Sequence, residues 1–118
     1  MSDAASMFKV GGVLLVAIQE DIDDTDIIDL QERLSNAVDD EDVNGVVIDI
    51  SALEIVDTFV GRVLGQLAKI AHLLSSRTYV VGMRPAVAMT LVELGMTLPE
   101  MRTALDVDQA MRRIREAR

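Results

Sequence analysis

The chain has 118 residues, half of them hydrophobic, and we expect residues 1–118 to form a single compact domain. Twenty acidic residues against eleven basic ones give a formal net charge of −9, which disfavours nucleic acid and anionic membrane surfaces as partners. Cysteine is absent, which excludes disulfides and thiolate chemistry. Met1–Lys9 lacks the pattern of a signal peptide, so we expect a cytoplasmic protein without a membrane span.

The predicted elements begin with a β-hairpin. Two apolar segments, Phe8–Val10 and Val13–Ile18, flank a Gly-Gly pair that can adopt the positive φ angles of a two-residue turn. Apolar residues then recur at three- and four-residue steps and predict a helix over roughly Asp24–Val38, with Asp23 or Asp24 as its N-cap.

The middle of the chain alternates between strand and helix. Val46–Ile50 is an apolar run with the length of a buried strand, and Thr78–Val81 predicts another strand. Between them, apolar side chains at helical spacing predict a helix over about Thr58–Ser75. Strand, helix and strand in this order form the crossover unit of a parallel sheet.

Two helices are expected near the end of the chain. Pro85 begins the first, and Gly95 is in the position of a residue that ends a helix. After a short connecting stretch around Ala104-Leu105, Asp106-x-x-Gln109 resembles a capping box that begins the last helix. The sequence therefore predicts an α/β fold with one mixed sheet, a leading hairpin and about four helices.

The candidate site is Asp57-Thr58-Phe59, where an extended segment turns into the most regular predicted helix. If Thr58 is the N-cap or a first-turn residue, its hydroxyl lies where backbone N–H groups lack intrahelical partners, and these donors can hold a phosphoryl group. An ordinary helix cap explains the same threonine. Gly61 and Gly65, one turn apart on this helix, indicate close approach of another backbone, either from the sheet or from a protein partner.

A receiver domain phosphorylated on Asp49 is one alternative. Asp49 ends a predicted buried strand, and the acidic pair Glu20-Asp21 follows an earlier one. A receiver also needs a lysine near the end of its last strand, whereas the two lysines of this chain, Lys9 and Lys69, fall in the hairpin and on a helix. The chain has one histidine and no phosphate-binding glycine motif, so we expect no catalytic residue, cofactor or metal site.

Four sequence blocks resemble the STAS domains of anti-sigma-factor antagonists, above all the single-domain scaffold members found in stressosomes: Leu14–Gln19, Asn44–Asp49, Val56–Phe59 and Pro85–Gly95. The resemblance implies a non-catalytic scaffold in the general stress response. Such a protein holds a switch serine/threonine kinase and releases it on phosphorylation, which a cognate phosphatase reverses. It also implies self-association and a large assembly with sensor-bearing STAS paralogues.

The resemblance also implies roles for individual residues. The phosphorylated hydroxyl follows an aspartate at the start of the second helix, which here gives Asp57 and Thr58, and the family's single-domain scaffolds have serine where this chain has threonine. A ligand-sensing STAS module that binds a nucleotide or lipid without phosphorylation is a further alternative. If the chain is a kinase-holding scaffold, we expect its partner-binding surface to comprise Asp23, Asp57, Thr58, Phe59, Gly61 and Arg62.

Overall fold

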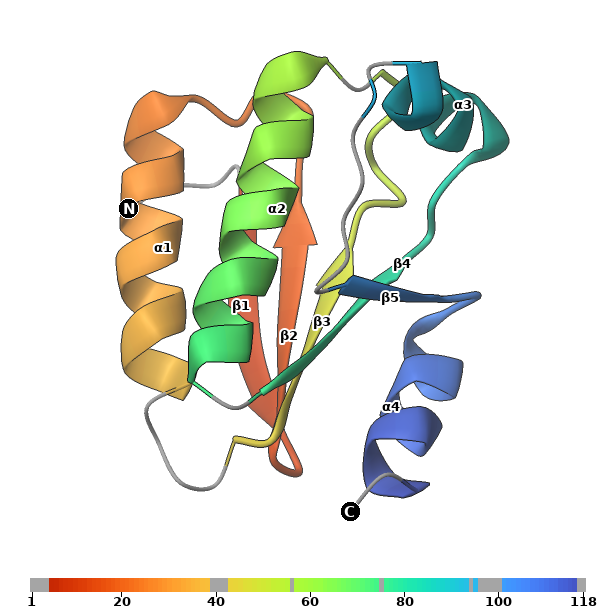
Figure 1. The fold of residues 1–118 in the computed structure, drawn as a ribbon. Coiled ribbons are helices and arrows are strands. Elements are labelled where there is room, and N and C mark those ends of the chain that lie inside the picture. The colour runs from red at the N-terminus through yellow and green to blue at the C-terminus, as the bar shows by residue number, and fades with distance from the viewer. Residues whose placement is uncertain are drawn as a thin grey trace.

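The structure is a computed structural model that describes residues 5–38, 43–55, 57–74, 76–93, 95 and 101–116. Within these residues, strands and helices largely alternate along the chain (Figure 1). The elements are β1 (Ala5–Val10), β2 (Val13–Ile18), α1 (Asp24–Val38), β3 (Gly45–Asp49), α2 (Thr58–Leu73), β4 (Arg77–Val81), α3 (Pro85–Glu93), β5 (Met101–Ala104) and α4 (Val107–Glu116).

The strands form one mixed sheet in the order β1-β2-β3-β4-β5. β1 is antiparallel to β2, and all the later pairs are parallel. The hairpin turns at Gly11 and Gly12, whose φ angles of 55° and 84° lie in the region that favours glycine. The predicted α/β class, the mixed sheet and the leading hairpin are confirmed.

Helices cover both faces of the sheet. α1 and α2 lie side by side on one face (Figure 1), and α3 adds Val87 and Leu91 to the core beneath them. Because side chains alternate along a strand, β2 directs Leu14, Val16 and Ile18 into this core. On the opposite face, α4 packs against β3, β4 and β5 over a second, smaller core.

Gly45, the first residue of β3, lies against α4. A Cβ atom at this position would come within 2.6 Å of Ile114 Cδ1 and 2.8 Å of Ile114 Cγ2. Such distances are too short for carbon atoms in contact, so glycine permits Ile114 to pack directly on the strand backbone. Ile114 is buried there with Ala110 and Met111 of the same helix.

The observed boundaries refine the predicted ones. α1 has the predicted bounds, while β3 begins and ends one residue earlier than expected, although the Ile50 N–H still bonds the Val81 carbonyl oxygen at 3.0 Å. α2 ends at Leu73 with Leu74 as its C-cap. The predicted last residue of that helix, Ser75, lies outside the described residues, as does Val56 of the resemblance.

The last third of the chain shows one confirmed boundary and one difference. The described part of α3 ends at Glu93, and Gly95, with a φ of 68° and its N–H bonded to the Val92 carbonyl oxygen at 3.0 Å, has the conformation expected of the residue that ends the helix. β5 was not predicted, because this four-residue edge strand lacks the apolar run that marks the inner strands. In the described part of the chain, no helix has both the length and the apolar character needed to cross a membrane.

Candidate functional site

The start of α2 is fixed by Asp57. This residue has extended backbone angles, and its Oδ1 accepts a hydrogen bond from the Val60 N–H at 2.9 Å, which makes it the N-cap. Its carbonyl oxygen accepts the Gly61 N–H at 3.1 Å, the first bond of the helix. Asp57 therefore performs the capping, and Thr58 is the first helical residue.

The Thr58 side chain is exposed. Since Asp57 already supplies the cap, the Thr58 hydroxyl has no structural task at the helix start, and it makes no hydrogen bond with any described residue. The backbone N–H groups of the first turn lack intrahelical acceptors, so the hydroxyl lies in a region of positive partial charge. An added phosphoryl group at this position is both sterically accessible and electrostatically tolerated.

The start of α1 has a reciprocal cap. Asp23 Oδ1 accepts the Asp26 N–H at 2.9 Å, and Asp26 Oδ2 accepts the Asp23 N–H at 3.0 Å. This is a capping box with aspartate at both positions. The N-cap predicted as Asp23 or Asp24 is therefore Asp23, and its side chain remains exposed to solvent.

Three loops at the carboxyl end of the parallel strands are joined by side-chain hydrogen bonds. Glu20, after β2, accepts the Glu54 N–H at 2.8 Å through Oε1, which ties the approach to α1 to the approach to α2. Arg84, after β4, donates to the Ser51 carbonyl oxygen from Nε at 3.3 Å and from Nη2 at 3.1 Å. These bonds hold the segment before Asp57 on both sides. Open α/β sheets commonly bind their ligands at this end.

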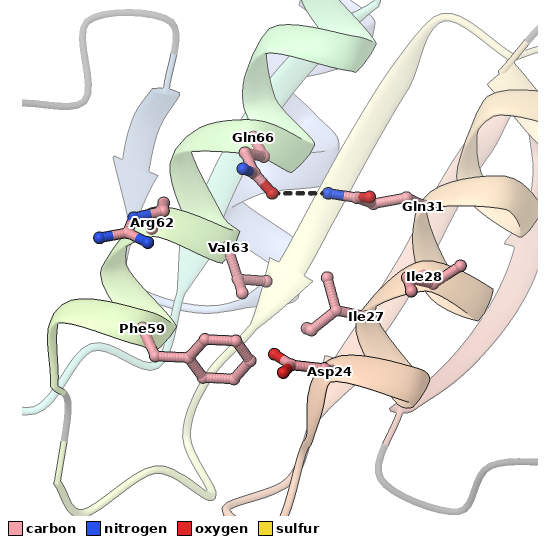
Figure 2. Close-up of a pocket in the computed structure, with 8 residues that line it drawn as sticks. All are labelled: Asp24, Ile27, Ile28, Gln31, Phe59, Arg62, Val63 and Gln66. Atoms are coloured by element: carbon pink, nitrogen blue, oxygen red, sulfur yellow. Dashed lines mark hydrogen bonds between the residues drawn. The ribbon is translucent and has the colours of Figure 1, made fainter.

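A groove of about 420 Å³ runs between α1 and α2, and Phe59, the residue after Thr58, lines it (Figure 2). One hydrogen bond of 2.7 Å crosses it, from Gln31 Nε2 to Gln66 Oε1. Ile28 on its α1 side is 65% exposed, one of several large hydrophobic side chains at the surface of the described residues. The lining residues are Asp24, Ile27, Ile28 and Gln31 from α1, and Phe59, Arg62, Val63 and Gln66 from α2.

Two of the predicted partner-binding residues, Phe59 and Arg62, line the groove. Phe59 is half-buried and points toward Ile27 across the groove, whereas Arg62 is exposed (Figure 2). Asp23 immediately precedes Asp24 of the groove, and Asp57 and Thr58 immediately precede Phe59. These residues therefore belong to one region of the surface.

The two glycines of α2 differ in their accessibility. Gly61 is buried and Gly65 is half-buried, which is consistent with close packing inside the chain. These glycines were explained either by packing inside the chain or by contact with a protein partner. The structure supports internal packing at Gly61, because this residue is buried and exposes little surface to a partner.

The fold does not support the receiver alternative. Receivers have an all-parallel sheet in the order 2-1-3-4-5, whereas this sheet begins with an antiparallel hairpin and follows the chain order. Asp49 is half-buried, and its Oδ1 accepts the Ser51 N–H at 2.9 Å. Lys9 is on β1 and Lys69 on α2, so neither follows the last strand.

Sequence reasoning missed several residues that shape this region. Glu20 was considered only as part of an acidic pair, and neither Gln31 nor Gln66 was assigned to the site. The bonds of these residues join positions 34 or 35 residues apart, and no local pattern marks such a contact. The one available signal was the placement of both glutamines on the helical faces beside the apolar stripes.

A family model described as the STAS domain matches residues 4–110. The chain therefore belongs to the STAS domain family. Within that family it is similar to RsbS from Moorella thermoacetica, solved as a serine-to-glutamate variant, with 38% identity, a TM-score of 0.83 and coverage of 96% of both chains. A chain in a structure of the stressosome, described as a signal integration and transduction hub, has the same identity and TM-score over 95% of this chain and 97% of that one.

Two Bacillus subtilis relatives match shorter segments. YezB is 36% identical over 69 residues, which cover 58% of this chain and 70% of YezB. The RsbT co-antagonist protein RsbRA is 32% identical over 74 residues, which cover 63% of this chain and 27% of RsbRA. The similarity to RsbRA thus concerns about a quarter of that protein. The RsbS similarity in particular supports a place among the stressosome and antagonist members of the family.

Proposed function

We propose that this protein is a non-catalytic stressosome scaffold that holds a switch serine/threonine kinase and releases it when Thr58 is phosphorylated. The observation that carries the proposal is the exposed Thr58 side chain at the start of α2. Because Asp57 caps this helix, the Thr58 hydroxyl is not needed for capping. The similarity to RsbS over 96% of the chain supports the same role. The RsbRA similarity supports assembly with larger STAS paralogues.

The proposed modification is a phosphoryl transfer from Mg-ATP. Thr58 Oγ1 attacks the γ-phosphorus, the bond from that phosphorus to the β–γ bridging oxygen breaks, and ADP leaves. The hydroxyl proton passes to a base of the kinase, because no described side chain of this protein accepts a hydrogen bond from the Thr58 hydroxyl. A cognate phosphatase reverses the modification by hydrolysis to threonine and inorganic phosphate.

Added charge accounts for the release. A phosphate adds about −1.5 to −2 at pH 7, next to Asp57 and on a chain whose net charge is already −9. The first turn of α2 tolerates the anion, so the fold persists while the contact surface changes. A kinase surface that accepts a neutral hydroxyl then faces a bulky dianion, and the complex dissociates.

The test is to incubate the protein with its switch kinase and Mg-ATP and to map the modification by peptide mass spectrometry. We expect one phosphate, on the peptide that contains Thr58, and none in a Thr58→Val variant, which keeps the shape of the side chain without its hydroxyl. Thr25→Val is the matched control, because Thr25 is an exposed threonine in the first turn of α1. Phosphorylation of Thr58→Val at the wild-type rate would contradict the assignment.

A further inference from the structure

We propose that Arg62 is the intramolecular counter-ion of phosphorylated Thr58. The inference rests on the proposed function and concerns the same site. It assigns Arg62 a role in the phosphorylated state of the protein itself, in addition to its expected contact with a partner.

Spacing places the two residues together. Thr58 and Arg62 are four residues apart on α2, a regular helix from Thr58 to Leu73, so they are neighbours on one face. Long side chains in helices lean toward the N-terminus, which directs Arg62 over the first turn, where Thr58 lies. The guanidinium extends from α2 on the side away from α1 (Figure 2).

Arg62 is also uncommitted. Its side chain is exposed and forms no hydrogen bond or ion pair with any of the residues that the structure describes. Asp24 lines the same groove from α1, yet the two do not pair. By contrast, Arg33 on α1 bonds Asp29 at 3.2 Å, also across four residues, which shows that this spacing supports an arginine–anion pair in this chain.

Phosphothreonine offers Arg62 a stronger partner than any nearby carboxylate. A guanidinium donates two parallel hydrogen bonds to phosphate oxygens, and the dianion carries more charge than an aspartate. The pair fixes the exposed Arg62 side chain beside the start of α2, on the side away from α1. A kinase that contacts this surface thus meets an added phosphate and also an arginine that is no longer available to its own acidic groups.

The experiment places phosphothreonine at position 58 during translation, by an expanded genetic code, so that no kinase is needed. The second pKa of the phosphate is then measured by phosphorus NMR across a pH titration. A nearby cation stabilises the dianion, so Arg62→Met should raise this pKa by about 0.5 relative to the otherwise unchanged protein. Arg62→Lys should restore most of the difference, because it keeps the charge.

Lys69→Met is the matched control. Lys69 is an exposed cation on the same helix, eleven residues from Thr58, and its replacement removes the same charge at a distance of about 16 Å along the axis. We expect it to leave the phosphate pKa within about 0.1 of the reference value. Equal pKa values in the Arg62→Met and reference proteins would overturn the inference. Failure of the kinase to modify Thr58 would instead overturn the proposed function, so the two failures are distinct.

Discussion

Asp57 combines a structural and a proposed functional role in one carboxylate. It caps α2 through the Val60 N–H, and it precedes the proposed phosphorylation site. Substitutions can separate the two roles, because serine and asparagine also cap helices, whereas alanine does not.

We expect Asp57→Ala to lower the free energy of unfolding by about 1 kcal/mol, and Asp57→Asn to lower it by less than about 0.5 kcal/mol. Urea unfolding followed by circular dichroism measures both values. Kinase binding is then compared between the wild-type protein and Asp57→Asn, in which the cap remains and the charge is lost. Equal unfolding free energies for Asp57→Ala and the wild-type protein would show that the cap contributes nothing.

At the scale of the elements, α4 is held on the sheet by one close approach. The Gly45 backbone leaves room for Ile114, and any larger residue there forces the helix or the isoleucine to move. We expect Gly45→Ala to lower the free energy of unfolding by about 1–3 kcal/mol, the usual cost of overpacking. Thermal or urea unfolding measures the loss.

A double-mutant cycle with Ile114→Val tests the cause of that loss. Valine lacks the Cδ1 atom that a Cβ at position 45 would meet at 2.6 Å. The double variant should therefore lose less stability than the sum of the two single variants, by about 0.5 kcal/mol or more. Strict additivity would mean that the cost of Gly45→Ala arises elsewhere, for example in the backbone of β3.

Prediction from sequence succeeded where an element carries its own signal. The apolar period of α1 and the Gly-Gly turn of the hairpin gave these elements correctly, since each depends on local chemistry. β5 has no such signal, because an edge strand of four residues is defined by its pairing with β4. The helix start at Asp57 and Thr58 also has a local signal, and the structure confirms that helix start, while the role of the two residues stays a prediction. The groove was not predicted, because it exists only when α1 and α2 lie side by side.

The charge of the whole molecule bears on how a partner approaches. The net charge is −9, and exposed acidic residues occupy the starts of α1 and α2 and the segment before α2, including Asp23, Glu54 and Asp57. The proposed release requires that the kinase place no basic group opposite Thr58 itself, so we expect its positive charge opposite Asp23 and Glu54, around the contact, where the attraction is screened by salt.

We expect the affinity for the switch kinase to fall several-fold between about 50 and 300 mM NaCl, chiefly through a slower association rate. Surface plasmon resonance at a series of salt concentrations measures both rate constants. Thr58→Val should show the same salt dependence, because it changes no charge. An affinity that does not vary with salt would argue for a contact made mainly through the apolar residues of the groove.

The sheet order has a consequence for how the chain folds. Each strand pairs with its neighbour in the sequence, but only the β1–β2 hairpin closes through a short turn, because each parallel pair joins strands that are separated by a helix, and such non-local pairing slows folding. Synthesis from the N-terminus completes the β1–β2 hairpin first, and each later strand can then add to a growing edge. The face of the sheet that α4 covers is completed last, because α4 follows all the other described elements in the sequence. Until α4 is synthesised, Val13, Val47 and Tyr79 on that face stay exposed to solvent.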